Sequence, residues 1–209
     1  MTGRPVQTPS TGDNSPNGAP RILVGACGAA SVVMLPNYLA TMRAKLGCHI
    51  TVVLTASAAR FIPPRTAGLF ADEVLDSTDP EVAFRSNHVK LASTHDLILV
   101  VPATANLLAD VVHGHAPSLL TATILAARTP VLLVPAMNRI MWSKPAVMRN
   151  IAQCRADGLE VIAPEWGQGF EVSSKRMVEN PAMPSFSDIA DIVSERLEKA
   201  RADLANLSA

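Results

Sequence analysis

Short runs of apolar residues recur along the chain, separated by longer segments in which apolar positions return every three or four residues. Such runs, bounded by turn residues, are typical of strands buried on both faces of a parallel sheet, and the spaced pattern is typical of helices. Strands are expected within Arg21–Ala30 and at His49–Leu54, Glu73–Leu75, Leu97–Val101, Val131–Val134 and Leu159–Ala163. Helices are expected at Val32–Leu46, from Ala58, and at Leu107–His113, Pro117–Ala127, Pro145–Ala156 and Ser187–Leu207. This alternation predicts an α/β fold built on a parallel sheet.

The composition indicates one folded domain behind an N-terminal tail. Residues 1–20 are rich in Pro, Gly, Ser, Thr and Asn, so we expect a disordered tail followed by a single domain over residues 21–209. The net charge is zero, from 18 basic and 18 acidic residues without a basic cluster, which argues against nucleic acid and anionic membrane as partners. Charged residues make up only 17%, which fits either a surface covered by other subunits or a large buried core.

The cysteines and histidines give no sign of a disulfide framework or a metal site. Cys27, Cys48 and Cys154 are an odd number at wide spacing, and His113 and His115 have no carboxylate or cysteine companion nearby. No apolar run reaches the roughly 18 residues of a membrane span, and the first residues lack the apolar core of a signal peptide. We therefore expect no metal and a soluble, cytoplasmic protein.

The stretch Pro-Ala-Met-Asn-Arg-Ile-Met-Trp at residues 135–142 directly follows the expected strand Val131–Val134. It therefore leaves the carboxyl edge of the sheet, where open α/β sheets bind ligands. Asn138 brings a donor and an acceptor there, and Met137, Met141 and Trp142 supply apolar surface that excludes water. The stretch suits a flat aromatic ligand with one polar handle. The alternative is that the methionines and the tryptophan simply fill the core.

Small residues and hydroxyls follow the first two expected strands. Gly25, Gly28, Ala29 and Ser31 would let backbone amides approach a phosphate, although small residues also serve strand–helix packing. The third glycine of the dinucleotide fingerprint is missing, which disfavours a nicotinamide cofactor. Thr55-Ala-Ser57 offers two more hydroxyls, which either contact a phosphate or cap the next helix.

The pattern Pro-x-Met-Asn-x-x-Met-Trp at residues 135–142 resembles the signature of the flavin-dependent cysteine decarboxylases. Residues Pro102-Ala-Thr-Ala-Asn106 resemble that family's flavin-binding motif Pro-Ala-Ser-Ala-Asn-Thr, in which small residues admit the isoalloxazine edge. Thr104 keeps the hydroxyl of the family's serine, whereas Leu107 replaces a threonine and loses one polar contact. The resemblance spans Arg21 to about Ile192 and implies a single-domain, Rossmann-like three-layer sandwich that is a flavoprotein.

A histidine motif and a polar segment indicate which branch of this family the chain resembles. His88-Val-Lys-Leu91 is similar to the segment that carries the active-site histidine in the epidermin-type peptidyl-cysteine decarboxylases, although a lone histidine is more often a surface or capping residue. The glycine-punctuated segment from Trp166 is expected to form a mobile substrate flap near residues 166–184. Phosphopantothenoylcysteine decarboxylases carry an Ala-Cys-Gly-Asp type sequence there, and residues 170–177 hold no cysteine, which favours the peptide-modifying branch.

The resemblance implies oxidative decarboxylation of the C-terminal cysteine of a lanthipeptide precursor. Hydride transfer from the β-carbon of the thiolate would give a thioaldehyde, and loss of CO₂ would then give an enethiolate, which leads to aminovinyl-cysteine. FMN is expected rather than FAD, bound at a subunit contact of a homotrimer that can assemble into a dodecamer. The alternatives are phosphopantothenoylcysteine decarboxylation in coenzyme A synthesis, or a non-catalytic flavin-binding regulatory relative.

Candidate residues follow from these motifs. We expect His88 to exchange a proton with the thiol and enethiolate, and Asn138 to hold the terminal carboxylate or thioaldehyde. Lys175 and Arg176 either pair with that carboxylate or are solvated surface charges. The remaining candidates for the substrate are Met141, Trp142, Ser173 and Ser174. Those for the flavin are Gly25, Cys27, Gly28, Ala29, Ser31, Thr55, Ser57, Pro102, Ala103, Thr104, Ala105, Asn106, Ala136 and Met137.

Overall fold

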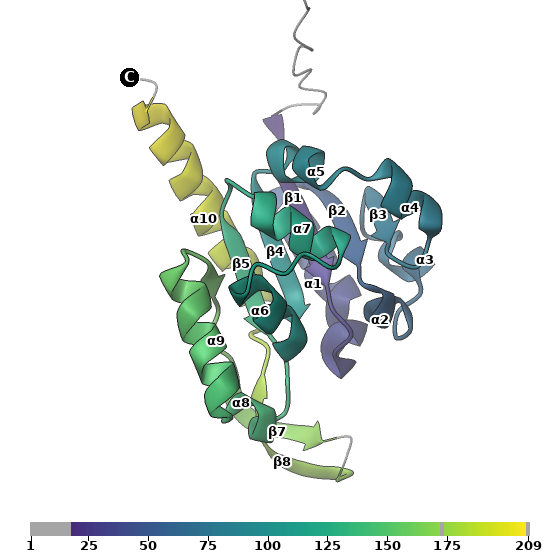
Figure 1. Ribbon diagram of the computed structural model, residues 1–209, viewed down its shortest axis with the longest axis vertical. Helices are drawn as coiled ribbons and strands as arrows, with labels where there is room; N and C mark the ends of the chain where they lie inside the picture. The colour runs from purple at the N-terminus through teal and green to yellow at the C-terminus, as the bar shows by residue number, and fades with distance from the viewer. Residues whose placement is uncertain (1–17, 172–173, 208–209) are drawn as a thin grey trace, which may run out of the picture.

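A computed structural model describes residues 18–171 and 174–207 (Figure 1). Residues 1–17, most of the segment expected to be a disordered tail, lie outside the described residues. Six parallel strands form the central sheet in the order β3-β2-β1-β4-β5-β6, which confirms the α/β fold. The strands are β1 (Arg21–Ala26), β2 (His49–Leu54), β3 (Glu73–Asp76), β4 (Leu97–Ala103), β5 (Val131–Pro135) and β6 (Glu160–Val161).

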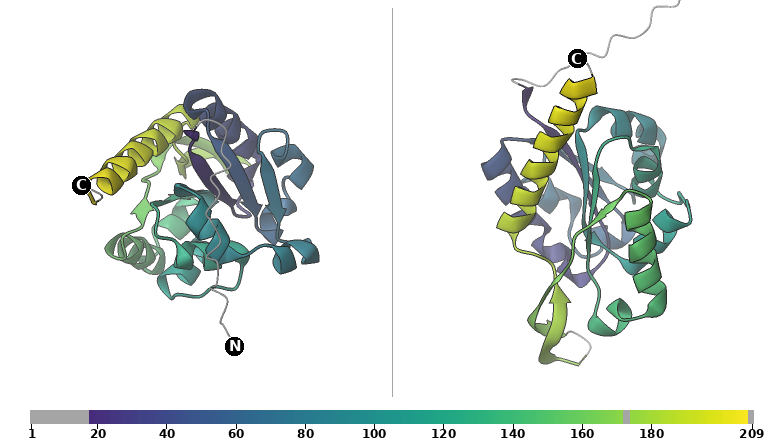
Figure 2. Two further views of the ribbon diagram at one scale, coloured as in Figure 1. Left: turned by 90° about the horizontal axis from the view of Figure 1, so that it is seen from above. Right: turned by 90° about the vertical axis from the view of Figure 1, so that its left-hand side faces the viewer.

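Helices cover both faces of this sheet, as the views in Figure 2 show. Helices α1 (Leu35–Leu46) and α10 (Phe186–Leu207) pack on one face. The other face is covered by α5 (His88–Thr94), α6 (Ala105–Val112), α7 (Leu119–Ala126) and α9 (Pro145–Ala156). Shorter helices lie in the connections: η2 (Ala30–Met34), α2 (Ala56–Ala59), α3 (Pro64–Ala67), α4 (Pro80–Arg85) and α8 (Arg139–Trp142). The three-layer sandwich follows from this arrangement.

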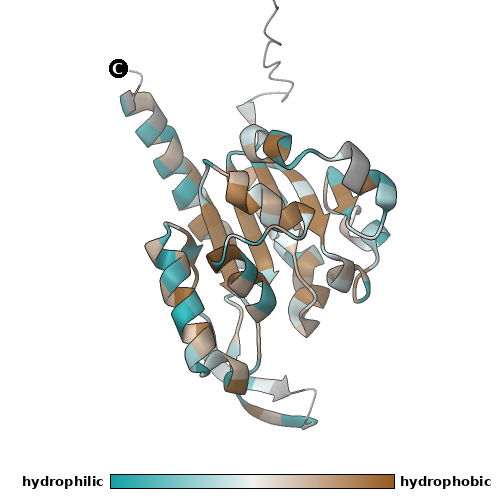
Figure 3. Ribbon diagram, in the orientation of Figure 1, coloured by the Kyte–Doolittle hydropathy of each residue, from teal (hydrophilic) through white to brown (hydrophobic). Residues whose placement is uncertain are grey.

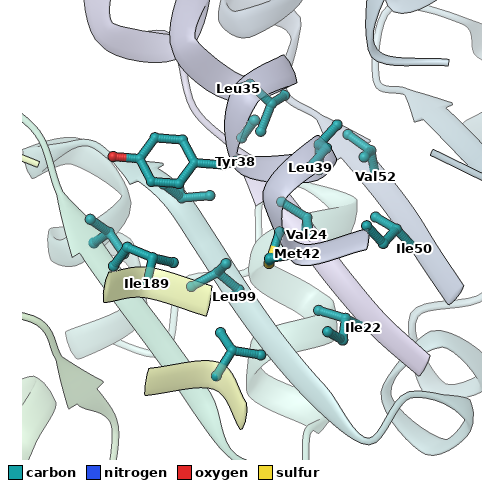
Figure 4. Close-up of a cluster of buried hydrophobic side chains, with 14 of the residues drawn as sticks. Ile22, Val24, Leu35, Tyr38, Leu39, Met42, Ile50, Val52, Leu99 and Ile189 are labelled. Atoms are coloured by element: carbon teal, nitrogen blue, oxygen red, sulfur yellow. The ribbon is translucent and has the colours of Figure 1, made fainter. Parts of the chain in front are cut away.

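Successive side chains of each buried strand serve the two separate cores. Ile22 and Val24 of β1 point toward α1 and α10, where Leu39 is fully buried (Figure 4). Leu23 belongs to the other cluster, with Leu120 of α7. Figure 3 shows apolar residues along the strands, and polar and apolar residues alternating along α9 and α10. Each fully buried aliphatic side chain contributes about 1.5–3 kcal/mol. The strands therefore have to be apolar on both faces, as their sequence indicates.

Four parts of the chain differ from the sequence-based expectation. Helix α1 begins only at Leu35, after the 3₁₀ turn η2, and the connection between β3 and β4 contains the helices α4 and α5, which were not expected. The expected last strand shortens to two residues. The segment expected to be an irregular flap forms an antiparallel hairpin of β7 (Glu165–Glu171) and β8 (Arg176–Ala182). Both strands of this hairpin expose most of their side chains, so their sequence lacks the apolar run that marks a buried strand.

The sheet order fixes where a ligand can bind. Strand β1 pairs with β2 on one side and with β4 on the other, so the chain leaves the carboxyl ends of β1 and β4 in opposite directions. Such a switch point opens a crevice at the carboxyl edge of the sheet. Within the described part of the chain, no helix is long and apolar enough to cross a membrane.

Candidate functional site

A cavity of about 750 Å³ lies at the carboxyl edge of the sheet. Its walls come from residues 28–31 after β1, residues 104–105 after β4, residues 136–138 and Met141 after β5, and the helix residues Met34 and Tyr38. Gly169 and residues 180–186, at the base of the hairpin and the start of α10, complete it. A volume of this size suits a cofactor-sized organic ligand. Segments far apart in the sequence therefore meet where the switch point predicts a site.

Nine of the residues singled out in the sequence line this one cavity. They are Gly28, Ala29, Ser31, Thr104, Ala105, Ala136, Met137, Asn138 and Met141. Most are small or apolar, which leaves room for a flat ring system and keeps water away from it. None of the described residues that line the cavity is charged. Polar recognition in the cavity therefore rests on hydroxyl groups, amides and backbone groups.

The turn after β1 packs tightly against α2 and leaves one buried hydroxyl unpaired. The Ser31 hydroxyl oxygen is buried and has no hydrogen-bond partner among the described residues. An unpaired buried hydroxyl is costly unless a ligand or water satisfies it. Gly28 brings its backbone against the helix start that carries Ser57, since a β-carbon at residue 28 would lie 2.4 Å from the Ser57 β-carbon. The Ser31 hydroxyl is therefore a polar group that a ligand in the cavity could satisfy, whereas packing against Ser57 explains the glycine at residue 28.

Gly28→Ala tests this packing. The added methyl group would overlap the side chain and backbone of Ser57, with a gap of 2.9 Å to its carbonyl carbon, so the turn must move. We expect a loss of about 1–3 kcal/mol in the free energy of unfolding, together with weaker flavin retention. Gly68→Ala is the matched control, because its nearest contact is an ordinary 3.5 Å. Equal stability of the two variants in thermal unfolding would contradict the proposed close approach.

Asn138 is held in place by the helix that follows it. It is the N-cap of α8, and its Oδ1 accepts a hydrogen bond from the Met141 backbone N–H at 2.8 Å. The oxygen of the amide is thereby committed, and the Nδ2 group keeps its two N–H donors for a ligand in the cavity. Met141 is 42% exposed and forms part of the wall. Trp142 instead packs against the core and does not line the cavity.

Several flavin candidates lie behind the cavity wall. Gly25 is inside β1, where an added β-carbon would lie 2.5 Å from Leu120, so close packing against α7 explains this glycine. Burial raises the pKa of the Cys27 thiol to about 11, so the group stays protonated and unreactive at neutral pH. The Cys27 N–H donates to the Pro102 carbonyl at 3.0 Å, which ties the first turn to the end of β4.

Other candidates serve the loops around the cavity. The Thr55 hydroxyl donates to the Ala26 carbonyl at 3.1 Å and accepts from the Ala58 N–H, so it joins β1 to the start of α2. The Ala103 carbonyl accepts from the Ala136 N–H at 2.8 Å. Asn106 is exposed on α6 and donates to Asp110 at 3.3 Å. Of the candidates Thr55, Ala103 and Asn106, none lines the cavity.

His88 lies away from the cavity. It is the exposed first residue of α5, a helix near the amino ends of the strands, whereas α8 and the hairpin lie at the opposite end (Figure 1). Asn87 caps this helix by accepting from the Val89 N–H at 2.9 Å. At the other end of α5, His95 is buried and donates from Nδ1 to the Leu91 carbonyl at 2.8 Å. Burial lowers the pKa of His95, which favours its neutral form.

The hairpin meets the cavity at its base. Ser174, Lys175 and Arg176 lie at or beside its turn, are exposed and do not line the cavity, and Ser173 lies outside the described residues. The Tyr38 hydroxyl donates to the Pro184 carbonyl at 2.6 Å and fixes the junction with α10. Burial raises the pKa of Tyr38 to about 12, so this donor persists over the working pH range.

Sequence reasoning missed the lining residues Met34, Tyr38, Asn180, Met183 and Phe186. In the sequence, Tyr38 looks like one more apolar position of a helix. Its contact with Phe186, whose ring centroid lies 4.7 Å away, brings it to the cavity and depends on tertiary structure. Asn180 lies within a polar segment that resembles a loop. No group of three or more residues suited to hold a metal ion occurs in the described ranges.

With the fold and the cavity in place, comparison with known proteins defines the class. The chain belongs to the Flavoprotein family, whose model matches residues 11–198. The mersacidin decarboxylase of Bacillus sp. (strain HIL-Y85/54728) is 36% identical over 154 residues, which cover 74% of this chain and 78% of that protein. The bifunctional coenzyme A biosynthesis protein CoaBC of Mycolicibacterium smegmatis is 32% identical over 191 residues. That match covers 90% of this chain but only 45% of the bifunctional protein.

Solved structures of cysteine decarboxylases are similar to this chain as well. The decarboxylase EpiD, in a variant complexed with the substrate peptide DSYTC, superposes with a TM-score of 0.76 at 25% identity, covering 83% of this chain and 97% of that one. The FMN-dependent cysteine decarboxylase SpaF superposes with a TM-score of 0.71 at 34% identity, covering 87% and 97%. These similarities confirm the family and the Rossmann-like fold inferred from the sequence motifs.

Proposed function

We propose that this protein is a flavin-dependent peptidyl-cysteine decarboxylase that oxidatively decarboxylates the C-terminal cysteine of a lanthipeptide precursor. The observation that carries the proposal is the cavity, which combines an uncharged lining with the fixed amide donor of Asn138. A free chain end offers a carboxylate and a thiol, and both fit such a cavity. The mersacidin relative and the peptide complex of EpiD support the substrate class.

The cofactor in this proposal is FMN. Residues 28–31 would hold its phosphate-bearing side chain, while Thr104, Ala105, Ala136 and Met137 would border the ring. Bound flavin supplies a two-electron oxidant, without which loss of CO₂ would leave an unstabilised carbanion. The similarity to SpaF, an FMN-dependent cysteine decarboxylase, supports FMN.

Asn138 and Met141 would orient the substrate. The Nδ2 group of Asn138 donates to the terminal carboxylate, which keeps that group fixed while the cysteine side chain meets the cofactor. Met141 closes the wall beside it and keeps water out. The charge left after CO₂ departs is delocalised onto sulfur, so the residues have to position this group rather than neutralise it.

His88 would act from a second subunit. Its place on α5, at the other end of the sheet, separates it from the cavity of its own chain. We propose a homotrimer in which His88 of one subunit enters the cavity of the next and exchanges a proton with the thiol or the enethiolate. Such a contact would cover exposed apolar side chains on α5 and on α7, which packs against it: Val89 is 56% exposed and Leu125 is 62% exposed.

The second candidate is decarboxylation of phosphopantothenoylcysteine, which the CoaBC match favours. Against it stands the hairpin sequence Phe-Glu-Val-Ser-Ser-Lys-Arg-Met at residues 170–177, which lacks the cysteine that the resemblance leads us to expect in that branch. The two candidates differ in the substrate that the same cavity accepts.

One experiment tests both cofactor and substrate. We expect the purified protein to be yellow, and denaturation to release non-covalent FMN that chromatography identifies. Peptides ending in cysteine, among them DSYTC, should lose CO₂ and two hydrogens by mass spectrometry, while phosphopantothenoylcysteine should not react. A colourless supernatant after denaturation would contradict the flavin site. Reaction with phosphopantothenoylcysteine alone would replace the peptide proposal by its alternative.

A further inference from the structure

Two asparagines from distant parts of the chain meet at the start of α8. Asn138 Oδ1 accepts from the Met141 N–H at 2.8 Å, and Asn180 Oδ1, from strand β8, accepts from the Arg139 N–H at 3.3 Å. The first N–H groups of a helix have no partner within the helix, so both side chains satisfy donors that would otherwise stay unpaired. The hairpin is thereby joined to the helix that carries Asn138.

These hydrogen bonds fix which end of each amide remains free for a ligand. A backbone N–H can bond only to the oxygen of an asparagine side chain, so the Nδ2 group of each residue is the free end. Neither Nδ2 group has a hydrogen-bond partner within the described part of the chain, and both residues line the same cavity. Two pairs of N–H donors therefore remain at one side of it.

Most other polar side chains of the lining are already engaged. The hydroxyl of Tyr38 donates to Pro184, and that of Ser185 donates to Asp188, each at 2.6 Å. The hydroxyl of Thr104 caps α6 by accepting from the Leu107 N–H at 3.3 Å. Ser31 has no partner among the described residues but belongs to the turn after β1, where the flavin is proposed. With no cation among the described lining residues, the two amides are the donors best placed for an anion on the hairpin side.

We propose that Asn180 is a specificity residue, and that its amide and that of Asn138 together hold the terminal carboxylate of the substrate. This inference rests on the proposed function and adds Asn180 as a second residue that binds the carboxylate beside Asn138. Two parallel N–H···O bonds match the two oxygens of a carboxylate, whereas a C-terminal amide or an internal residue offers only one acceptor there. The exposed cations at the hairpin turn are then not required for choosing a free chain end.

Asn180→Asp is the most informative variant. The carboxylate keeps an oxygen for the Arg139 N–H, so the hairpin stays docked, but it replaces the donor with an acceptor that repels the substrate carboxylate. Asn206→Asp, an exposed change of the same kind on α10, is the control. Thermal unfolding and FMN titration establish that each variant folds and binds the cofactor.

The experiment measures how strongly two non-oxidisable peptides inhibit the decarboxylation of DSYTC. The peptides are DSYTS with a free C-terminal acid and DSYTS with a C-terminal amide. For Asn180→Asp we expect the inhibition constant of the free acid to rise about 10–100-fold, and that of the amide to change less than about twofold. Asn180→Ala should weaken both peptides, with the larger loss for the free acid, because it also undocks the hairpin. Limited proteolysis of the hairpin measures that second effect.

Other results would overturn the inference. Equal losses for acid and amide in Asn180→Asp would make Asn180 a hairpin anchor only. An unchanged Asn180→Asp beside a selective loss of the free acid in Arg176→Ala would assign the carboxylate to the cation at the turn. If the parent protein bound FMN but neither peptide, the proposed function itself would fail, and this inference with it.

Discussion

His88→Asn should reduce turnover about 10²–10⁴-fold, the usual contribution of general acid–base catalysis, while leaving the fold and the bound flavin intact. The side chain is exposed at the start of α5, and the cap on that helix comes from Asn87, so removing the imidazole disturbs no packing. Single-turnover decarboxylation of a cysteine peptide measures the loss. His115→Asn, with a side chain 71% exposed, should behave as the parent. Unchanged turnover in His88→Asn would remove this residue from the mechanism.

Subunit sharing makes a sharper form of this prediction. If His88 serves the cavity of a neighbouring subunit, inactive His88→Asn and inactive Asn138→Asp chains should complement each other when they are refolded together. A working site needs the cavity of a His88→Asn chain, which keeps Asn138, next to the histidine of an Asn138→Asp chain. Random mixing in a closed ring produces this pairing at about one quarter of the sites. Activity near that level would support the shared site. A mixture as inactive as its two components would contradict the shared site, because it would mean that each chain must supply both His88 and Asn138 to its own cavity.

The sheet and its ligand edge could be predicted because they depend on short-range pattern. Strands buried on both faces must be apolar throughout, and Leu97–Val101 and Val131–Val134 show this without ambiguity. Chain direction then places the residues after those strands at one edge. The sequence alone could therefore assign three positions to one ligand site: Thr104, Asn138 and the turn at Gly28.

The hairpin and its contacts could not be predicted in the same way. Its strands expose most of their side chains, so the glycines at 167 and 169 dominate the pattern and suggest a loop. The role of Asn180 depends on one tertiary hydrogen bond to Arg139, which leaves no trace in local sequence. The position of His88 could not be predicted either. A sequence motif identifies a candidate side chain, but it does not tell whether that side chain serves the cavity of its own chain or that of a neighbouring subunit.

Asn138→Asp should abolish turnover as thoroughly as His88→Asn, by a different cause and without loss of stability. Aspartate is as good an N-cap as asparagine, so its oxygen can still accept from the Met141 N–H and α8 should keep its start. What is lost is the Nδ2 donor, and what is gained is a negative charge that faces the carboxylate of the substrate in a cavity whose described lining holds no cation. We expect a fall in turnover of about 10²-fold or more, because the substrate is no longer held in place, with an unchanged unfolding temperature.

Asn138→Ala separates the two tasks of this side chain. It removes the cap as well as the donor, so it should lose about 1 kcal/mol of stability in addition to activity. Thermal unfolding in parallel with turnover of the cysteine peptide gives both quantities. Should Asn138→Asp keep its turnover while Asn138→Ala loses stability, Asn138 would be a helix cap that merely borders the cavity, and the carboxylate would have to be held by Asn180 or by the hairpin cations instead.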